Sequence, residues 1–289
     1  MSERIAYLSD GPTSIDSAVR AIAPRFELEL VELSVDSGAS RAIDHQEGAL
    51  HLAAQTLGLV ESLGLTRVLT SSDAVTLHLR RSARRLAADG SLRERVNAKL
   101  AEVDAAPTTG AVEVQHLVWE IAGERGLALL HEHCVRPLDD LRVALLRGCQ
   151  LLRPSRDLGA SEPDLLTPLG RVIAGCGAVE VPIESSSGCC GAAAAQTRPA
   201  IAFGAAAVPL AEASDADAEA LVVASSRCYA MLCDRREQIA RHADRELAVP
   251  VLHVSQLVAL AFGLRGGELQ LDRVSAGSRA VAGRLAAPV

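Results

Sequence analysis

The sequence Gly188-Cys189-Cys190-Gly191 places two adjacent cysteines between glycines, and this loop limits what the chain can fold into. Neighbouring side chains on a strand point to opposite faces, so one core cannot take up both cysteines. The apolar run 179–183 before the loop predicts a strand, and the alanine-rich run after Gly191 predicts a helix. We therefore expect both thiols at a strand-to-helix turn, where backbone N–H groups and the helix dipole favour anions and lower a thiol pKa.

The alternatives to a cofactor site at this loop are an exposed reactive thiol pair and a strained vicinal disulfide. The chain of 289 residues has seven cysteines and begins Met1-Ser2-Glu3-Arg4, without an apolar signal segment. No apolar run approaches the roughly 20 residues that cross a bilayer. We therefore expect a cytoplasmic protein without a membrane span, whose cysteines serve metal or redox chemistry rather than a disulfide framework.

Charge and aromatic content argue against nucleic acid as a partner. The formal net charge is −7, aromatic residues make up 2% of the chain, and no basic stripe dominates the sequence. Apolar residues nevertheless make up 49%, so alanine, leucine and valine must build the core. The length suggests one large or two medium domains.

Strands alternate with helices along the chain, which predicts an α/β fold with parallel sheets covered by helices on both faces. A crossover is expected at 136–140, between pseudo-repeated domains 1–137 and 138–289. Expected strands lie at 4–8, 26–33, 67–70 and 112–118 in the first half and at 141–146, 179–183, 220–224 and 249–254 in the second. Expected helices lie at 13–23, 42–63, 75–100 with a break near Asp89-Gly90, around Trp119, and then at 164–174, 191–213, after Cys228 to about 243, and at 256–263 with Ser255 as its cap.

The two halves also match in sequence. Residues 5–11 align with 143–149, and residues 68–75 align with 221–228, in the same order within each half. This indicates an internal duplication. In parallel sheets, sites form at the carboxyl ends of the strands, and four cysteines of the second half fall at such ends. We expect Cys149, Cys189, Cys190 and Cys228 to converge at one edge of a sheet.

Several short segments carry a resemblance to a known family. They are residues 148–154, 188–191, 251–257 and 260–264 in the second half and residues 95–97 and 115–117 in the first. With the cysteine pattern, they resemble the CCG, or cysteine-rich, domain of the heterodisulfide reductase B subunit. That family includes similar subunits of glycolate oxidase, lactate utilisation and sulfur-oxidising complexes. The resemblance covers nearly the whole chain.

The resemblance implies an iron–sulfur site in the second half. Each CCG motif of the family usually supplies one cysteine, an adjacent pair and a Cys-x-x-Cys, and five such cysteines can bind a noncubane cluster at which disulfides are reduced. Here the motif keeps four, and four thiolates suffice for an ordinary [4Fe–4S] cube. We therefore expect a [4Fe–4S] cluster, cubane or noncubane. The implied ligands are Cys149, Cys189, Cys190 and Cys228.

Other positions of the two motifs depart from the family. Ser225 stands in place of the first member of Cys-x-x-Cys, and Cys233 would substitute for the missing cysteine only if the following helix starts late. The first motif has lost all its cysteines, so domain 1–137 is CCG-like without ligands and domain 138–289 carries the site. Its positions are taken by Gly11, Ser37-Gly38, Ser72 and Val75.

The implied function is that of a component like the B subunit in a cytoplasmic heterodisulfide-reductase-like complex. It would transfer electrons at a thiol/disulfide or sulfur-carrier site, and it would be part of an oxidoreductase. Neither half shows a Gly-x-Gly-x-x-Gly turn for a dinucleotide, so a ferredoxin-like protein of the C-subunit type and a flavin-containing subunit are the expected electron-carrying partners. The alternative is a non-catalytic scaffold subunit with a structural or vestigial cluster.

Other cysteine and histidine positions have simpler interpretations. Cys176 precedes a predicted strand and is expected to be a small core residue. The run His131-Glu132-His133-Cys134 resembles a metal motif, but alternating side chains on a helix do not share a face. We expect this run to be structural or exposed.

Three further groups have both a structural and a functional interpretation. Tyr229 either packs in the core or lines the cluster pocket. The serines 185–187 either form a polar loop or donate hydrogen bonds to the sulfurs of a cluster. Such hydrogen bonds would raise the reduction potential of the cluster. An arginine-rich helix face is expected to be solvated or to dock an acidic partner; it consists of Arg80, Arg81, Arg84 and Arg85.

Overall fold

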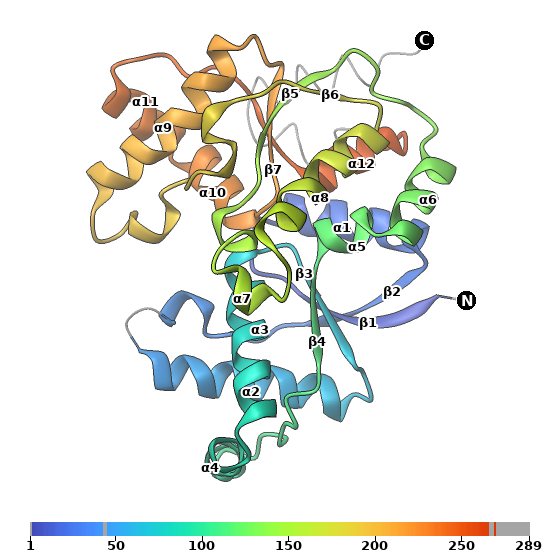
Figure 1. The fold of residues 1–289 in the computed structure, drawn as a ribbon, viewed down its shortest axis with the longest axis vertical. Coiled ribbons are helices and arrows are strands. Elements are labelled where there is room, and N and C mark those ends of the chain that lie inside the picture. The colour runs from blue at the N-terminus through green and yellow to red at the C-terminus, as the bar shows by residue number, and fades with distance from the viewer. Residues whose placement is uncertain (1, 43–44, 266–268, 270–289) are drawn as a thin grey trace.

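A computed structural model of the chain describes residues 2–42, 45–265 and 269. The predicted second domain extends to residue 289, and its residues 266–268 and 270–289 lie outside the described part. The described residues form two four-stranded parallel sheets flanked by helices (Figure 1), which confirms the predicted α/β class. The two sheets lie within different halves of the chain, as the duplication predicts.

Both sheets have the same strand order. The first sheet runs β2-β1-β3-β4, and the second runs β6-β5-β7-β8. In each half the first strand lies inside the sheet and the second strand forms one edge beside it. The third and fourth strands then lie on the opposite side of the first strand. The strands are β1 (Glu3–Leu8), β2 (Leu28–Leu33), β3 (Arg67–Thr70), β4 (Glu113–His116), β5 (Arg142–Leu146), β6 (Val179–Glu180), β7 (Ala220–Val223) and β8 (Val251–His253).

The helices of the two halves correspond in order. The first half has α1 (Thr13–Ile22), α2 (Gln46–Ser62), α3 (Asp73–Ala88), α4 (Gly90–Ala101), α5 (Leu117–Ala122) and α6 (Glu124–His133). The second half has α7 (Ser155–Leu158), α8 (Glu162–Gly175), α9 (Pro199–Asp215), α10 (Ser226–Asp234), α11 (Arg236–Ala243) and α12 (Val254–Ala261). By position after their strands, α1 corresponds to α8, and α5 corresponds to α12.

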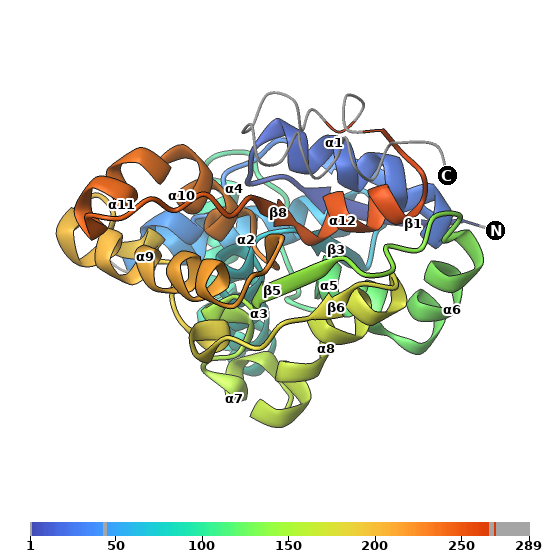
Figure 2. The ribbon, with the colours of Figure 1, turned by 90° about the horizontal axis from the view of Figure 1, so that it is seen from above.

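These four helices join the halves. Helix α1 packs against α12, and α5 packs against α8, so the same contact occurs twice with the halves exchanged (Figures 1 and 2). Successive side chains of β1 point to opposite faces of the sheet, so this strand contributes to two cores. Ile5 and Tyr7 belong to the large core shared with the second half, whereas Ala6 and Leu8 face the separate core under α2 and α3.

The cysteine loop differs from its prediction. Strand β6 ends at Glu180, although the Val181 N–H still donates to the Val143 carbonyl at 2.8 Å, and its two residues are exposed at the edge of the sheet. The next long helix, α9, begins only at Pro199. Gly191 has a left-handed φ of 77°, and a Cβ there would lie 2.3 Å from the Ala202 carbonyl oxygen, so the backbone cannot continue as a helix. The cysteine pair therefore precedes a single 3-10 turn, Ala192–Ala194, and not the predicted long helix.

The arginine-rich face of α3 is not simply solvated. The Arg80 guanidinium donates to the Leu158 carbonyl at 2.7 Å and lies 4.8 Å from the centre of the Trp119 ring. Arg81 pairs with Asp157 at 2.7 Å, and Arg84 donates to the Arg156 carbonyl. The short helix α7 leaves these carbonyls without partners within the helix, so the arginines complete its C-terminal end. The acidic partner that we considered for this face is partly the chain's own second half.

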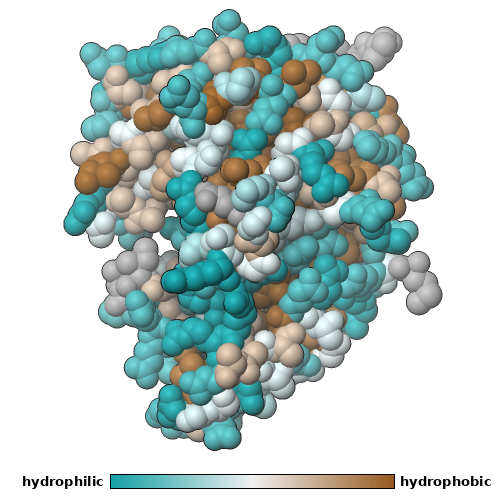
Figure 3. All heavy atoms as spheres, in the orientation of Figure 1, coloured by the Kyte–Doolittle hydropathy of each residue, from teal (hydrophilic) through white to brown (hydrophobic). Residues whose placement is uncertain are grey.

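Surface hydropathy is mixed on the face drawn in Figure 3. Hydrophilic residues cover most of it, and the hydrophobic ones form separate patches. Within the described ranges, we find no helix that combines the length and the apolar character needed to cross a membrane.

Two buried histidines cap corresponding helices. His116 caps α5 and His253 caps α12, and each ring accepts a hydrogen bond from the backbone N–H two residues later. Gln256 completes a capping box at α12 by accepting from the His253 N–H at 2.9 Å, so His253 rather than the predicted Ser255 is the cap. Burial lowers the pKa of His116 to about 3 and that of His253 to about 4.

These pKa shifts predict a loss of stability in weak acid. An unfolded histidine has a pKa of about 6.5, so below that pH the unfolded chain binds protons that the folded chain does not. The free energy of unfolding should therefore fall as the pH is lowered from about 6.5 towards 4. His253→Asn keeps a capping side chain that cannot titrate, and it should reduce the slope by up to about 1.4 kcal/mol per pH unit.

Urea unfolding at several pH values measures this slope. His131→Asn, at an exposed position of α6, is the matched control substitution. A slope in His253→Asn equal to that of the wild type would contradict the assignment of a neutral buried ring.

Candidate functional site

Three neighbouring strands of the second sheet are followed by segments that carry cysteines. Cys149 begins the turn after β5, the Cys189-Cys190 pair lies in the loop after β6, and Cys228 lies in the first turn of α10 after β7. Since β6, β5 and β7 are adjacent and parallel, their carboxyl ends meet at one edge of the sheet.

The four thiols form a continuous chain of contacts. Cys189 influences the pKa of Cys149 and of Cys190, and Cys228 influences that of Cys190, so neighbouring thiols lie within interaction distance. Cys190 and Cys228 are buried, Cys149 is half-buried, and Cys189 is exposed. Residues far apart in the sequence thus converge as their positions predict, with Cys189 on the solvent side.

Negative charge is stabilised most strongly at Cys189. Hydrogen bonds from Cys149 and Cys190 lower the pKa of Cys189 well below its ordinary value, with help from the Gly191 N–H at 3.3 Å and the charge of Arg227. The same contacts and burial raise the pKa of Cys149 and of Cys190. These contacts therefore favour the thiolate form at Cys189 over that at Cys149 and Cys190.

Backbone contacts hold the cysteine loops against each other. The Arg147 N–H donates to the Ser186 carbonyl at 2.9 Å, and the Arg153 guanidinium donates to the Ser187 carbonyl at 2.9 Å. Gly148 has a left-handed φ of 81°, which turns the chain from β5 into Cys149. The Ser185 hydroxyl donates to Glu212 at 2.7 Å, so it is not a donor to the cysteine sulfurs as one interpretation predicted.

The other predicted side chains lie elsewhere. The Cys233 side chain interacts with Tyr229. Helix α10 already begins at Ser226, so the late helix start that Cys233 would need as a ligand does not occur. Cys176 is fully buried, which confirms its prediction as a core residue. The His133 ring packs against Phe262 at 6.1 Å, as expected for a structural position.

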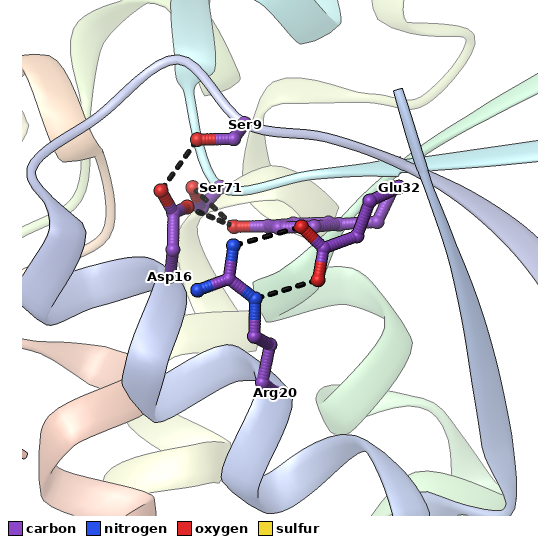
Figure 4. A network of polar contacts seen from close by, with 6 residues as sticks. Ser9, Asp16, Arg20, Glu32 and Ser71 are labelled. Carbon is purple, nitrogen blue, oxygen red and sulfur yellow. Dashed lines mark hydrogen bonds and ion pairs between the residues drawn. The ribbon is translucent and has the colours of Figure 1, made fainter. Parts of the chain in front are cut away.

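The corresponding edge of the first sheet has no thiol at the motif positions. Ser72 caps α3 and donates to Asp10 at 3.3 Å, while a Cβ on Gly11 would lie 2.7 Å from the Ser226 Cβ. Oxygen groups gather around the buried Asp16, which accepts hydrogen bonds from Tyr7 at 2.7 Å and Ser9 at 2.5 Å (Figure 4). The nearby Arg20–Glu32 pair continues this polar network at 2.6 Å.

Sequence reasoning missed two charged residues beside the cysteines, Asp73 and Arg227. Asp73, from the first half, accepts a hydrogen bond from the Ser225 hydroxyl at 2.6 Å, and the charge of Arg227 acts on both Asp73 and Cys189. Burial raises the pKa of Asp73, while Ser225 and Arg227 act in the opposite direction. In the aligned repeats Asp73 corresponds to Ser226. This correspondence was the sequence signal that could have drawn attention to Asp73.

The donor set fits an iron–sulfur cluster better than a single ion. Among the residues that the structure describes, no three histidine, cysteine or acidic side chains are arranged around a point that one metal ion could occupy. A four-iron cube instead takes one thiolate per iron, and its ligands surround a larger object. Four converging thiols, with one side open to solvent, match that requirement in number and in softness.

Comparisons with known proteins identify the family of this chain. Residues 143–233 match the CCG family, described as a cysteine-rich domain. The chain is 31% identical to the 8-methylmenaquinol:fumarate reductase membrane anchor subunit of Wolinella succinogenes, over 92% of both chains. It is 26% identical to a protein of Archaeoglobus profundus that is named as similar to the heterodisulfide reductase B subunit, over 86% of this chain and 85% of the relative.

The fold also occurs in a solved structure. A hypothetical protein from Helicobacter pylori superposes with a TM-score of 0.72 at 15% identity, over 93% of this chain. Our chain spans 51% of that structure, and at this identity the likeness shows the fold alone. The sequence matches go further: this chain belongs to the CCG cysteine-rich family that includes the heterodisulfide reductase B subunit.

Proposed function

We propose that this chain is an iron–sulfur subunit of a heterodisulfide-reductase-like complex, in which it transfers electrons at a thiol/disulfide or sulfur-carrier site. The observation that carries the proposal is the chain of contacts from Cys149 through Cys189 and Cys190 to Cys228. Relatives of this chain include B subunits of heterodisulfide reductases. In our proposal these four cysteines hold one [4Fe–4S] cluster.

The chain's own residues would supply binding and electrostatics. When bound, the cluster supplies one-electron transfer. Buried Cys190 and Cys228 would hold the cluster together with Cys149 and Cys189, and Cys189 is exposed to solvent, where a substrate or partner can approach. The Gly191 N–H and Arg227 stabilise negative charge at Cys189. Hydrogen bonds and charges of this kind tune the potential of such a centre.

The proposal includes partners and a location. A cytoplasmic complex with a ferredoxin-like protein of the C-subunit type and a flavin-containing subunit would deliver or remove the electrons. This arrangement follows from a site with one cluster and from a sequence without a dinucleotide turn. It is also consistent with relatives that are named as subunits of larger reductases.

A second candidate is a scaffold subunit whose cluster is structural. Two observations favour it: the first edge has no thiol at Gly11, Ser37, Ser72 or Val75, and one relative is named a membrane anchor subunit of a fumarate reductase. In that case the chain would dock an oxidoreductase partner without reacting with substrate. A cluster that cannot be reduced by the native electron donor would favour this candidate.

Iron content tests the proposed cluster and its place. Protein purified without oxygen should contain about four irons and four acid-labile sulfides per chain, as one [4Fe–4S] cluster requires. Elemental analysis, combined with EPR of the reduced and the oxidised protein, makes the measurement. About eight irons would show that the first half also holds a cluster, and an iron-free protein would overturn the proposal.

Cysteine substitutions test the ligand set. Cys190→Ala should lose most of the iron, because it removes the thiol that contacts both Cys189 and Cys228. Cys176→Ala, also at a fully buried position, should retain iron and lower the free energy of unfolding by only about 1 kcal/mol. Iron analysis and urea unfolding measure the two effects. Equal iron loss in both variants would show that the ligand set is wrong.

A further inference from the structure

Asp73 is a buried carboxylate in an unusual place. It is the first residue of α3, in the half of the chain without thiols at its motif positions, and its exposed fraction is 3%. From the described part of its own half, the side chain accepts a hydrogen bond from the Ala74 N–H at 2.8 Å. A buried carboxylate is costly unless several donors surround it, so further partners must come from elsewhere.

Those partners belong to the second half. The Ser225 hydroxyl donates to Asp73 Oδ1 at 2.6 Å, and the Asp73 N–H donates back to Ser225 Oγ at 3.3 Å. The Gln150 N–H reaches Asp73 Oδ2 at 3.4 Å. Gly148 also lies close, since a Cβ built there would be 3.4 Å from Oδ2. The Asp73 side chain is the acceptor in each of its hydrogen bonds named here, as an ionised carboxylate is.

The contacted residues carry the two ends of the thiol chain. Gln150 follows Cys149 directly, and Ser225 lies three residues before Cys228 on the same β7–α10 turn. One side chain thus ties the loop of the first thiol to the loop of the last. Its charge is also among the causes that raise the pKa of Cys149.

We propose that Asp73 is a positioning residue of the cysteine site, supplied by the other half: it holds the Cys149 and Cys228 loops together, keeps the Ser225 hydroxyl turned away from the thiols, and places a negative charge beside the cluster. This inference rests on the proposed iron–sulfur function. Negative charge near a cluster opposes the uptake of an electron and lowers its reduction potential. The degenerate half is then a working part of the site.

The duplication explains how a residue of one half comes to serve the other. In the aligned repeats Asp73 corresponds to Ser226, and Ser226 crosses in the reverse direction. Its N–H donates to the Ser71 carbonyl at 2.9 Å, and its Cβ lies against Gly11. Asp73 therefore contacts the edge of the second sheet, and Ser226 contacts the edge of the first. Each of these two residues follows a serine, Ser72 or Ser225, in the turn after an inner strand.

Two substitutions separate the roles of Asp73. Asp73→Asn keeps an oxygen that can accept from Ser225 but removes the charge, whereas Asp73→Ala removes both. With iron content close to the wild type, both variants should shift the midpoint potential of the cluster to more positive values. Asp73→Ala should in addition change the EPR g values of the reduced cluster, because both cysteine loops lose their common acceptor.

Asp16→Asn is the matched control. Asp16 is another buried carboxylate of the first half, 5% exposed, and it accepts hydrogen bonds from the hydroxyls of Tyr7 and Ser9 rather than from the cysteine loops (Figure 4). The same chemical change there should leave both the potential and the g values as in the wild type. This comparison removes general effects of losing a buried charge.

The outcomes separate this inference from the function on which it rests. Wild-type protein without iron would overturn both. Wild-type protein with about four irons, together with unchanged potentials in the Asp73 variants, would overturn the inference alone and leave Asp73 as a residue of the interface between halves. If Asp73→Ala does not fold, the potential of Asp73→Asn decides.

Discussion

The packing of α1 against α12 and of α5 against α8 is the contact on which the rest of the structure depends. It joins the two sheets through a shared core, in which Ile15 and Leu257 are fully buried. Removing such a side chain typically costs about 2–5 kcal/mol, whereas a hydrogen bond between loops contributes about 1 kcal/mol. The helices therefore fix the arrangement, and the loops at the strand ends adjust to it. Because the arrangement is nearly symmetric, the edges of the two sheets meet and exchange residues.

The two edges have the same framework but different chemistry. In the second half, the strand ends carry soft thiols; in the first, equivalent strand ends carry glycine and serine, and a carboxylate network around Asp16 fills the neighbouring space. Gly11 shows why the loss cannot be reversed by one substitution. A side chain there would collide with Ser226 from the other half. The first edge has thus been repacked by its neighbour, and the contact between Asp73 and Ser225 shows the same exchange in the other direction.

Much of this arrangement could be predicted from the sequence. Alternating apolar runs indicated the strands and their parallel order, and the position of Cys149, Cys190 and Cys228 after such runs predicted their convergence. The contact between Asp73 and Ser225 was missed because it joins the two halves, which periodicity does not report. The start of α9 at Pro199 was missed within the second half, where Gly191 has a left-handed φ and approaches Ala202 closely. Negative charge at Cys189 is therefore favoured by neighbouring thiols, a backbone N–H and Arg227 rather than by the dipole of α9.

We propose one cluster at the thiol edge of the second sheet and none at the corresponding edge of the first. Anomalous diffraction at the iron absorption edge, from crystals grown without oxygen, locates the iron. We expect anomalous density enclosed by Cys149, Cys189, Cys190 and Cys228, with Asp73 beside it, and none near Gly11 and Ser72. Iron density at the edge of the first sheet would contradict this proposal. Iron density that is out of contact with two of the four cysteine sulfurs would also contradict it.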